Sequence, residues 1–326
     1  MRAQSIQGVV VIFPGALGDL VLALPALRAL RRRHGGAYLT AVVREPLRSL
    51  VALTGVADAT ASLDSADATW LFGGARQPRW LEGRPFVYTW LGAGEAVLRA
   101  RLDAVAARVR CFSVECGPGA THAAGAYVRA VGVALDARTL AGAARIVPPP
   151  SPAADAVWIA LASPVLALHA GAGGRSKRWA AEGFAQLGAR WCAAGGSVVT
   201  VAGPAEQGDL PVADGPVVRD WPLGDVAAVL ARAAVYVGND SGVSHLAGAV
   251  GARGVVLFGP TDPRRWRPLG TGLRVLRARS TGRDGIALAA LPVRRVFAAC
   301  RRLVTLTRRD LDTSVARTAG RAGDGE

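Results

Sequence analysis

The 326-residue chain is poor in several residue types, and its few cysteines exclude certain kinds of site. It contains four cysteines, one lysine and only 6% aromatic residues. The cysteines lack the spacing of a metal site or of a dense disulfide framework, so we expect isolated thiols, as in a cytoplasmic protein, and no metal site. These scattered cysteines are Cys111, Cys116, Cys192 and Cys300.

A long uninterrupted apolar run is also missing. The nearest approach to one is the stretch 8–30, where Asp19 and Arg28 are the only charged residues but Pro14 and Gly15 break the pattern. No small-residue cleavage site follows a basic segment there, so neither a signal peptide nor a membrane-spanning helix is expected. A buried strand, a loop and a helix fit this stretch better.

Acidic residues are in deficit as well. The chain carries 39 basic and 24 acidic residues, a net charge of +15, and Lys177 is its one lysine. A genome rich in G and C would favour arginine without any functional cause. An anionic partner, such as phospholipid headgroups or a phosphorylated glycan, is the other explanation. No recognition helix, RNA-binding motif or zinc finger is present, so we expect an anionic membrane surface or glycan and no nucleic acid.

The chain is 51% hydrophobic, and its apolar runs alternate with helical patterns. Strands separated by helices imply an α/β fold with mostly parallel, doubly wound sheets. The predicted strands are 9–13, 38–43, 69–72, 86–90, 109–113, 165–169, 198–202 and 235–237, and the predicted helices are 20–33, 180–194, 225–233 and 291–306.

One proline-rich stretch divides the chain. Residues 146–152 read Ile-Val-Pro-Pro-Pro-Ser-Pro, which predicts a stiff, extended linker. We therefore expect two Rossmann-like domains, residues 1–148 and 149–326, with polar loops on facing edges. Such an arrangement is typical of an enzyme with a central cleft.

The most informative segment is Gly238-Asn-Asp-Ser-Gly242, which follows an apolar run and leads directly into a helical pattern. The N–H groups at such a helix start form a site for an anion such as a diphosphate. Asp240 and Ser241 are both good N-cap residues, and His245 falls about one turn into the helix. The apolar run 254–258 ends in a second polar loop, which should open at the same ligand-binding edge of the sheet. An ordinary capped turn without a ligand is the alternative.

Two more loops of the second half have groups suited to a nucleotide. The glycine-rich run after residue 169 includes Gly171 and ends near Lys177, whose point charge suits a phosphate oxygen. A single lysine in an arginine-rich chain is a stronger signal than the glycines. Glu206 follows a predicted strand and could accept hydrogen bonds from a ribose, or it could be a solvated loop acid.

A glycine-containing loop also opens the first half, Gly15-Ala-Leu-Gly-Asp19. Gly15 and Gly18 allow a sharp turn and a close approach to an acceptor or diphosphate. Their spacing differs from the G-x-G-x-x-G dinucleotide fingerprint, so NAD binding is not supported. Asp19 is either a helix N-cap, worth about 1 kcal/mol, or a general base.

These motifs together resemble glycosyltransferase family 9, the ADP-heptose-dependent lipopolysaccharide heptosyltransferases. The similarity covers nearly the whole chain and includes Lys177-Arg-Trp179 and Phe258-Gly-Pro-Thr-Asp-Pro263. It implies a GT-B architecture with two Rossmann-like domains facing a central cleft. The N-terminal domain would bind the acceptor, and the C-terminal domain would bind the nucleotide-sugar donor.

The resemblance also implies roles for individual residues. Asp19 would be the catalytic base, Lys177 would bind the donor phosphate, and Glu206 would contact the nucleoside. Trp221 would pack near adenine, although a tryptophan that only seals the core is the alternative. The residues that would hold the diphosphate and the sugar are Asp240, Ser241, Gly242 and His245.

We therefore expect an inverting transferase that needs neither metal nor cofactor, since no D-x-D pair stands beside the phosphate loop. The donor would be ADP-heptose, and the acceptor a lipid-linked acidic glycan such as the lipopolysaccharide core. The protein would work in the cytoplasm, including the inner face of the membrane. A GT-B protein that binds nucleotide sugar or glycan without turnover is the alternative. A nicotinamide oxidoreductase is disfavoured by the missing fingerprint.

Overall fold

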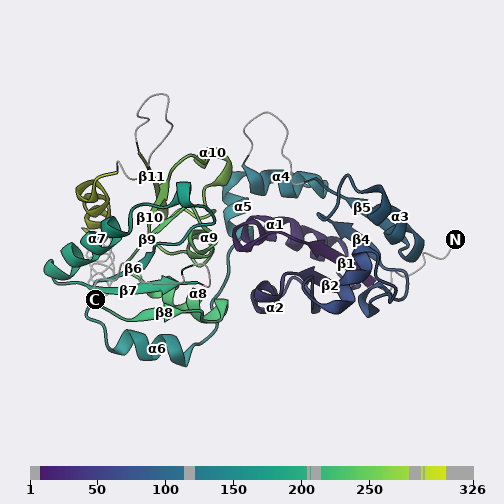
Figure 1. Cartoon of the computed structure of the whole chain (residues 1–326), viewed down its shortest axis with the longest axis horizontal. Helices are drawn as coiled ribbons and strands as arrows, with labels where there is room; N and C mark the ends of the chain where they lie inside the picture. The colour runs from purple at the N-terminus through teal and green to yellow at the C-terminus, as the bar shows by residue number, and fades with distance from the viewer. Residues whose placement is uncertain are drawn as a thin grey trace, which may run out of the picture. The chain divides into compact units, whose positions relative to one another are not determined.

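The computed structural model describes residues 8–113, 122–203, 206, 214–278, 288 and 291–305. The chain divides into two compact units, each built on one parallel sheet flanked by helices (Figure 1). The first unit comprises Met1–Pro150, Pro222–Ala227 and Asp262–Gly270. The second comprises Ser151–Trp221, Ala228–Thr261 and Thr271–Glu326.

Five strands form the sheet of the first unit: β1 (Gly8–Phe13), β2 (Tyr38–Val43), β3 (Ala59–Ser62), β4 (Phe86–Thr89) and β5 (Arg108–Cys111). Their order is β3-β2-β1-β4-β5. The central strand β1 is buried from Val9 to Phe13 without alternation, which is typical of a parallel sheet covered on both faces. Its register runs from Gly8↔Tyr38 to Phe13↔Val43, so β1 and β2 end at the same level.

The helix predicted over 20–33 is present in the first unit, with its leucines at helical spacing. The buried face of α1 includes Leu20, Leu24, Leu27 and Leu30, and α1 packs against α4 and α5. The α-helices are α1 (Leu17–Arg33), α2 (Arg48–Thr54), α3 (Ala96–Val105), α4 (Ala123–Ala130), α5 (Ala137–Ala143) and α10 (Pro263–Trp266), and the 3-10 helices are η1 (Glu45–Leu47), η2 (Ala66–Phe72) and η3 (Arg79–Leu81).

Six strands form the sheet of the second unit, in the order β11-β10-β9-β6-β7-β8. They are β6 (Val165–His169), β7 (Ser197–Ala202), β8 (Val217–Arg219), β9 (Val235–Asn239), β10 (Gly254–Phe258) and β11 (Leu273–Arg277). The helices are α6 (Pro152–Ile159), η4 (Arg175–Lys177), α7 (Ala181–Ala193), α9 (Gly242–Ala249) and a last helix over 293–305, while α8 (Leu223–Arg232) contributes residues to both units. The core between β6, β9, β10, α7 and the last helix includes Trp179, Phe184 and Val296.

The fold class, α/β with two parallel sheets, is confirmed, and three details of the prediction are wrong. The run 69–72 lies in the 3-10 helix η2, not in a strand. The strands β3, β8 and β11 were not predicted, because all three are sheet edges whose side chains are only partly buried. The predicted linker is shorter than expected, since Ser151 caps α6 and Pro152 begins it.

The described residues also bear on the expectations about membrane-spanning helices and cysteines. No helix in this part of the chain is both long enough and apolar enough to cross a membrane. Cys111, Cys192 and Cys300 are free thiols, and burial raises the pKa of Cys300 to about 12, which keeps it protonated and inert. Cys116 and the segment after residue 305 lie outside the described residues.

Candidate functional site

Three strands of the second unit end at the same edge of its sheet. β6 pairs with β9 as far as His169↔Gly238, and β9 pairs with β10 as far as Asn239↔Leu257. The loops that follow these strands therefore leave the sheet as neighbours, at the carboxyl edge where such folds bind ligands. The loops after β10 and β6 also touch, since a Cβ on Gly259 would lie 3.1 Å from the carbonyl oxygen of Ser176.

Lys177 and Asp240 meet at this edge. Lys177 ends η4, and its Nζ donates to Oδ2 of Asp240 over 3.0 Å. The Asp240 side chain is 5% exposed and the Lys177 side chain 37% exposed. A buried carboxylate loses its hydration and needs a partner of opposite charge. Lys177 supplies that charge while part of its side chain stays at the surface, within reach of an anionic ligand.

The helix α9 starts directly after this pair. Ser241 is its N-cap, since its Oγ accepts from the N–H of Ser244 over 3.4 Å. This confirms one of the two predicted cap residues, while Asp240 instead pairs with Lys177. Gly242 is the first residue of α9, and His245 is buried in its first turn. The first N–H groups of a helix have no acceptor within it, so this end attracts negative charge.

The turn between β9 and α9 is held by a buried hydroxyl pair. Ser244 Oγ donates to the carbonyl of Asn239 over 2.6 Å and lies 2.8 Å from Tyr236 Oη. Because the serine proton is already used, Tyr236 donates its own. Burial raises the pKa of Tyr236, which keeps this donor protonated. A Cβ on Gly238 would lie 2.1 Å from Tyr236 Oη, so glycine is needed there.

Glu206 lies against the loop after β6. Its Oε2 accepts from the N–H of Gly203 over 2.6 Å. A Cβ on Gly171 would lie only 1.8 Å from Glu206 Oε1, so the missing side chain of Gly171 makes room for this carboxylate. His169 also lies against Gly171. Its Nδ1 is 2.9 Å from the carbonyl oxygen of Val201, and burial lowers the pKa of this histidine. A neutral imidazole that donates from Nδ1 fits this bond.

Trp221 lies at the same edge but further along it. It is half-buried and follows β8, which is separated from β6 by β7. β8 adjoins β7, the strand that precedes Glu206, and neighbouring strands are about 4.8 Å apart. Trp221 and Glu206 therefore follow adjacent strand ends.

The predicted residues of the first unit gather at the carboxyl end of β1. Asp19 is in the first turn of α1, half-buried, and its Oδ2 accepts from the N–H of Ala16 over 3.3 Å. Ala16 is the N-cap, so Asp19 is not the cap itself but reaches back to it. Gly15 lets this loop lie against the β1 strand end, since its Cβ would meet the Phe13 ring at 2.5 Å. Gly18 is the second residue of α1.

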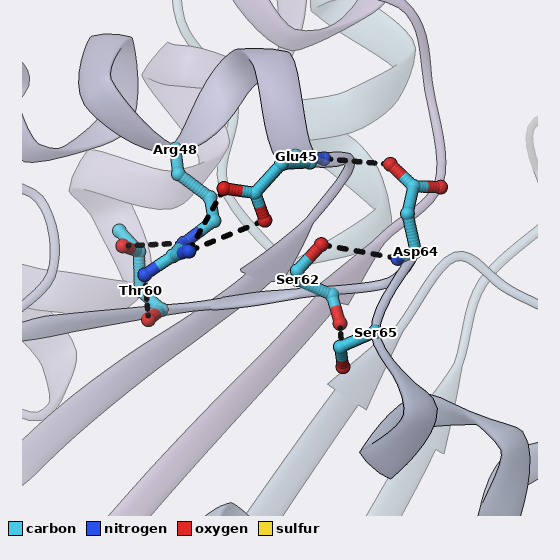
Figure 2. Close-up of polar contacts among 6 residues, drawn as sticks. All are labelled: Glu45, Arg48, Thr60, Ser62, Asp64 and Ser65. Carbon is cyan, nitrogen blue, oxygen red and sulfur yellow. Dashed lines mark hydrogen bonds and ion pairs between the residues drawn. The ribbon is translucent and has the colours of Figure 1, made fainter.

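A polar network ties down the loops beside this end of β1 (Figure 2). The N–H of Glu45 donates to Asp64 Oδ2 over 2.8 Å, and the N–H of Asp64 donates to Ser62 Oγ over 3.1 Å. The Ser62 hydroxyl, and then the Arg48 guanidinium 2.9 Å away, lower the pKa of Glu45. The network joins the loops after β2 and β3: Glu45 pairs with Arg48, and Asp64 accepts from a backbone N–H. We therefore assign it to structure.

Comparison with known families gives a match that includes the strands of the second unit's sheet. The family model described as glycosyltransferase family 9 (heptosyltransferase) matches residues 135–284. These residues match glycosyltransferase family 9. The matched segment contains all the residues predicted to bind the donor, whereas Asp19 lies outside it. Comparison with curated proteins gives no match.

Solved structures share the fold of this chain. A glycosyl transferase family 9 protein from Veillonella parvula is 19% identical, with 93% of this chain and 99% of that one covered and a TM-score of 0.73. E. coli ADP-heptose LPS heptosyltransferase II is 20% identical, with 92% and 99% covered and a TM-score of 0.66. E. coli heptosyltransferase WaaC with ADP is 18% identical, with 90% and 99% covered and a TM-score of 0.62.

Metal independence stays a prediction. One structural neighbour, the E. coli glycosyltransferase TibC, is described as iron-containing; it is 15% identical, with a TM-score of 0.55. Among the residues placed by the structure, no three histidine, cysteine, aspartate or glutamate side chains gather as metal ligands do.

One residue of the edge was missed by the sequence analysis. Asn239, the last residue of β9, is completely buried against the loop after β6. It is the only asparagine in the chain. That rarity, combined with its place beside Asp240, is the signal that could have drawn attention to it.

Proposed function

We propose that this chain is a family 9 glycosyltransferase, an inverting heptosyltransferase that uses ADP-heptose as donor. The single observation that carries this is the placement of the only lysine beside Asp240 at the start of α9. The proposal is supported by neighbours of the same fold that were solved with ADP and with ADP-2-deoxy-2-fluoro heptose.

In this proposal the carboxyl edge of the second sheet binds the donor. Lys177 and the first N–H groups of α9 receive the diphosphate, while Glu206, set against Gly171, receives the ribose and Trp221 the adenine. Asp240, Ser241, Gly242 and His245 surround the diphosphate and the sugar. As the bond from the anomeric carbon to the diphosphate breaks, the leaving group gains negative charge, which Lys177 and the helix start stabilise.

Asp19 is the proposed general base. It takes the proton of the acceptor hydroxyl, whose oxygen forms the new bond to the anomeric carbon from the face opposite the leaving diphosphate, so the anomeric configuration inverts. The hydrogen bond from the Ala16 N–H keeps the carboxylate directed toward the start of α1. Gly15 and Gly18 leave the loop around it free of bulky side chains.

We propose a lipid-linked acidic glycan, such as the lipopolysaccharide core, as the acceptor. The net charge of +15 suits such a partner and the anionic inner face of the cytoplasmic membrane. The site of action would be the cytoplasm, where the protein would associate peripherally with that surface.

The test is turnover of ADP-heptose with a heptose-deficient lipopolysaccharide acceptor, with and without a chelator. Release of ADP with formation of a heptosylated product, equal in both conditions, supports the proposal including metal independence. Loss of turnover with the chelator would contradict only the predicted metal independence. Donor binding without any product, against several acceptors, would instead favour the non-catalytic binding protein.

A further inference from the structure

One buried amide holds both ends of the loop that carries Lys177. Asn239 Nδ2 donates to the carbonyl of Ala170, at the start of the loop, over 2.7 Å. Its Oδ1 accepts from the N–H of Trp179, at the end of the loop, over 3.0 Å. Asn239 is 0% exposed, so water cannot replace either bond.

The chemistry of the two ends explains why an amide is needed here. The start of the loop offers a carbonyl, which can only accept, and the end offers an N–H, which can only donate. Asparagine carries a donor and an acceptor on one planar group, so it satisfies both. An aspartate would lack the donor, and a leucine of similar size would lack both, which would leave buried backbone groups without partners.

Two further contacts restrain the loop, one within it and one with Gly259. The Arg178 guanidinium donates to the carbonyl of Ala172 over 3.0 Å through Nη2. The backbone of Ser176 lies against Gly259, where no Cβ would fit without displacing it. With both ends joined through one side chain, the loop keeps little of the freedom of an open loop of this length.

Asn239 is followed immediately by Asp240, the partner of Lys177. Asp240 is fixed in turn, since its N–H donates to the carbonyl of Leu257 over 3.0 Å. The side chain that sets the position of the lysine loop and the carboxylate that receives the lysine therefore come from adjacent residues. Any shift of the loop relative to Asn239 moves Lys177 Nζ relative to Asp240.

We propose that Asn239 is a positioning residue that sets where Lys177 presents its charge, by holding both ends of the loop 170–179. The consequence for donor binding rests on the proposed function, in which Lys177 receives the diphosphate. The placement of Lys177 in the free protein does not depend on that function.

The first test uses the fact that Lys177 is the only lysine. An acetylating reagent added to the free protein modifies Lys177 and the α-amino group alone, and peptide mass spectrometry separates the two. We expect Asn239→Leu and Asn239→Asp to raise the acetylation rate of Lys177 by about threefold to tenfold, the range for a lost hydrogen bond. Both variants free the loop that presents the lysine to Asp240.

Trp191→Phe is the matched control. It removes another buried hydrogen bond of the same unit, from Nε1 to the carbonyl of Pro164 over 2.9 Å, away from the loop. Its acetylation rate is expected to equal that of the wild type. Equal rates in the wild type, the control and Asn239→Asp would overturn the proposal. Asn239→Asp keeps the acceptor for Trp179, so it tests the proposal even where Asn239→Leu does not fold.

The second test is a double-mutant cycle on ADP affinity. We expect Asn239→Leu to weaken ADP binding by about tenfold in the wild type but hardly at all beside Lys177→Ala, because the asparagine acts through the lysine. Adenosine affinity is expected to stay unchanged. An equal loss of ADP affinity in both backgrounds would make Asn239 merely structural and overturn the inference. A wild type that does not bind ADP would overturn the proposed function, and acetylation would then decide the positioning role alone.

Discussion

Asp19, Lys177 and Trp221 differ in how firmly the fold holds their side chains. Lys177 is paired with a buried carboxylate, Asp19 accepts from the N–H of Ala16 in its own turn, and Trp221 is half-buried. Lysine differs from arginine here in a way that matters, because an ammonium is a compact point charge on a flexible stem, whereas a guanidinium is a planar fork. A chain that uses arginine almost everywhere has lysine at this position.

Replacing Asp19 tests the proposed base. We expect Asp19→Asn to lower kcat by roughly 100-fold or more, the usual effect of losing a general base, while ADP affinity stays the same. An amide still accepts from the N–H of Ala16, so the start of α1 is preserved. Asp67→Asn, at an exposed acid of the same unit, is the control. Wild-type turnover in Asp19→Asn would leave this carboxylate as a capping group only.

Replacing Lys177 tests the phosphate contact. A charge-assisted hydrogen bond is worth roughly 1.5–3 kcal/mol, so Lys177→Ala is expected to weaken ADP binding about tenfold to a hundredfold. Adenosine lacks the diphosphate, and its affinity is expected to stay nearly constant. Calorimetry with both ligands distinguishes the outcomes, because an equal loss for adenosine would indicate a collapsed loop. Asp240→Asn in the same background is expected to recover stability, since it removes the buried charge left unpaired.

Trp221 is tested by its fluorescence. If adenine packs against this half-buried indole, addition of ADP changes the emission of the wild type and leaves Trp221→Phe with little or no change. The chain has eight tryptophans, so the variant is needed to assign the signal. An unchanged response in Trp221→Phe would show that the signal arises elsewhere and that Trp221 only seals the start of α8.

At the scale of elements, the carboxyl edge of the second sheet, the proposed donor edge, depends on how β6, β7 and β9 end together. His169 closes β6 and bonds the carbonyl of Val201 on β7, while Gly238 and Tyr236 shape the end of β9. The loops then begin from fixed points: Gly171 two residues after β6, Glu206 four residues after β7 and Asp240 directly after β9. These loops leave the sheet at one edge because parallel strands of matching register end at one level.

The buried histidine at the end of β6 gives the fold a pH dependence. Burial lowers the pKa of His169 below its ordinary value of 6.5, although the Val201 carbonyl and the Glu206 charge oppose this. The unfolded chain binds a proton as the pH falls below about 6.5, whereas the folded chain does not, so the free energy of unfolding decreases in that direction. We expect the Tm to fall between about pH 7.5 and pH 5.5 and His169→Asn to flatten the slope. The same slope in both proteins would assign the effect to other groups.

At the scale of the whole molecule, charge is the dominant property. Arginine supplies nearly all of the basic residues, and the net charge of +15 exceeds what any ligand of the donor edge requires. Attraction to an anionic surface is worth about 1 kcal/mol for each basic residue near it and fades within a Debye length of roughly 8 Å at physiological salt. Attraction of this kind would hold the protein at the surface that carries the proposed lipid-linked acceptor.

Vesicle binding tests this attraction. Association is expected to rise with the fraction of anionic lipid and to fall steeply as the salt concentration is raised, because each contact is screened. Sedimentation with neutral and anionic vesicles at two salt concentrations measures both effects. Equal binding to the two vesicle types, or none to either, would leave the arginine content as a consequence of genome composition.

The central strands were predictable from the sequence, whereas of the four edge strands only β5 was predicted, as the run 109–113. The strands 165–169 and 38–43 were predicted at the observed bounds because they are mostly buried apolar runs. β3, β8 and β11 lie at sheet edges, and each places exposed or half-exposed residues within the strand, so no apolar run marks them. The misassigned run 69–72 buries Trp70 and Leu71 in a 3-10 helix, which shows that short apolar runs do not distinguish a strand from a helical turn.

The sequence by itself determined the α/β class and the resemblance to glycosyltransferase family 9, because buried strand runs and polar loop motifs are local features of the chain. It also singled out the residues of the proposed donor site, which stay a prediction. Only the tertiary structure decided which side chains become partners. Lys177 and Asp240 are 63 residues apart in sequence, and only the register of β6 and β9 brings them within 3.0 Å. The same holds for Asn239, whose role follows from two backbone groups at the far ends of another loop. No local pattern specifies such contacts, because they depend on which strands become neighbours in the sheet.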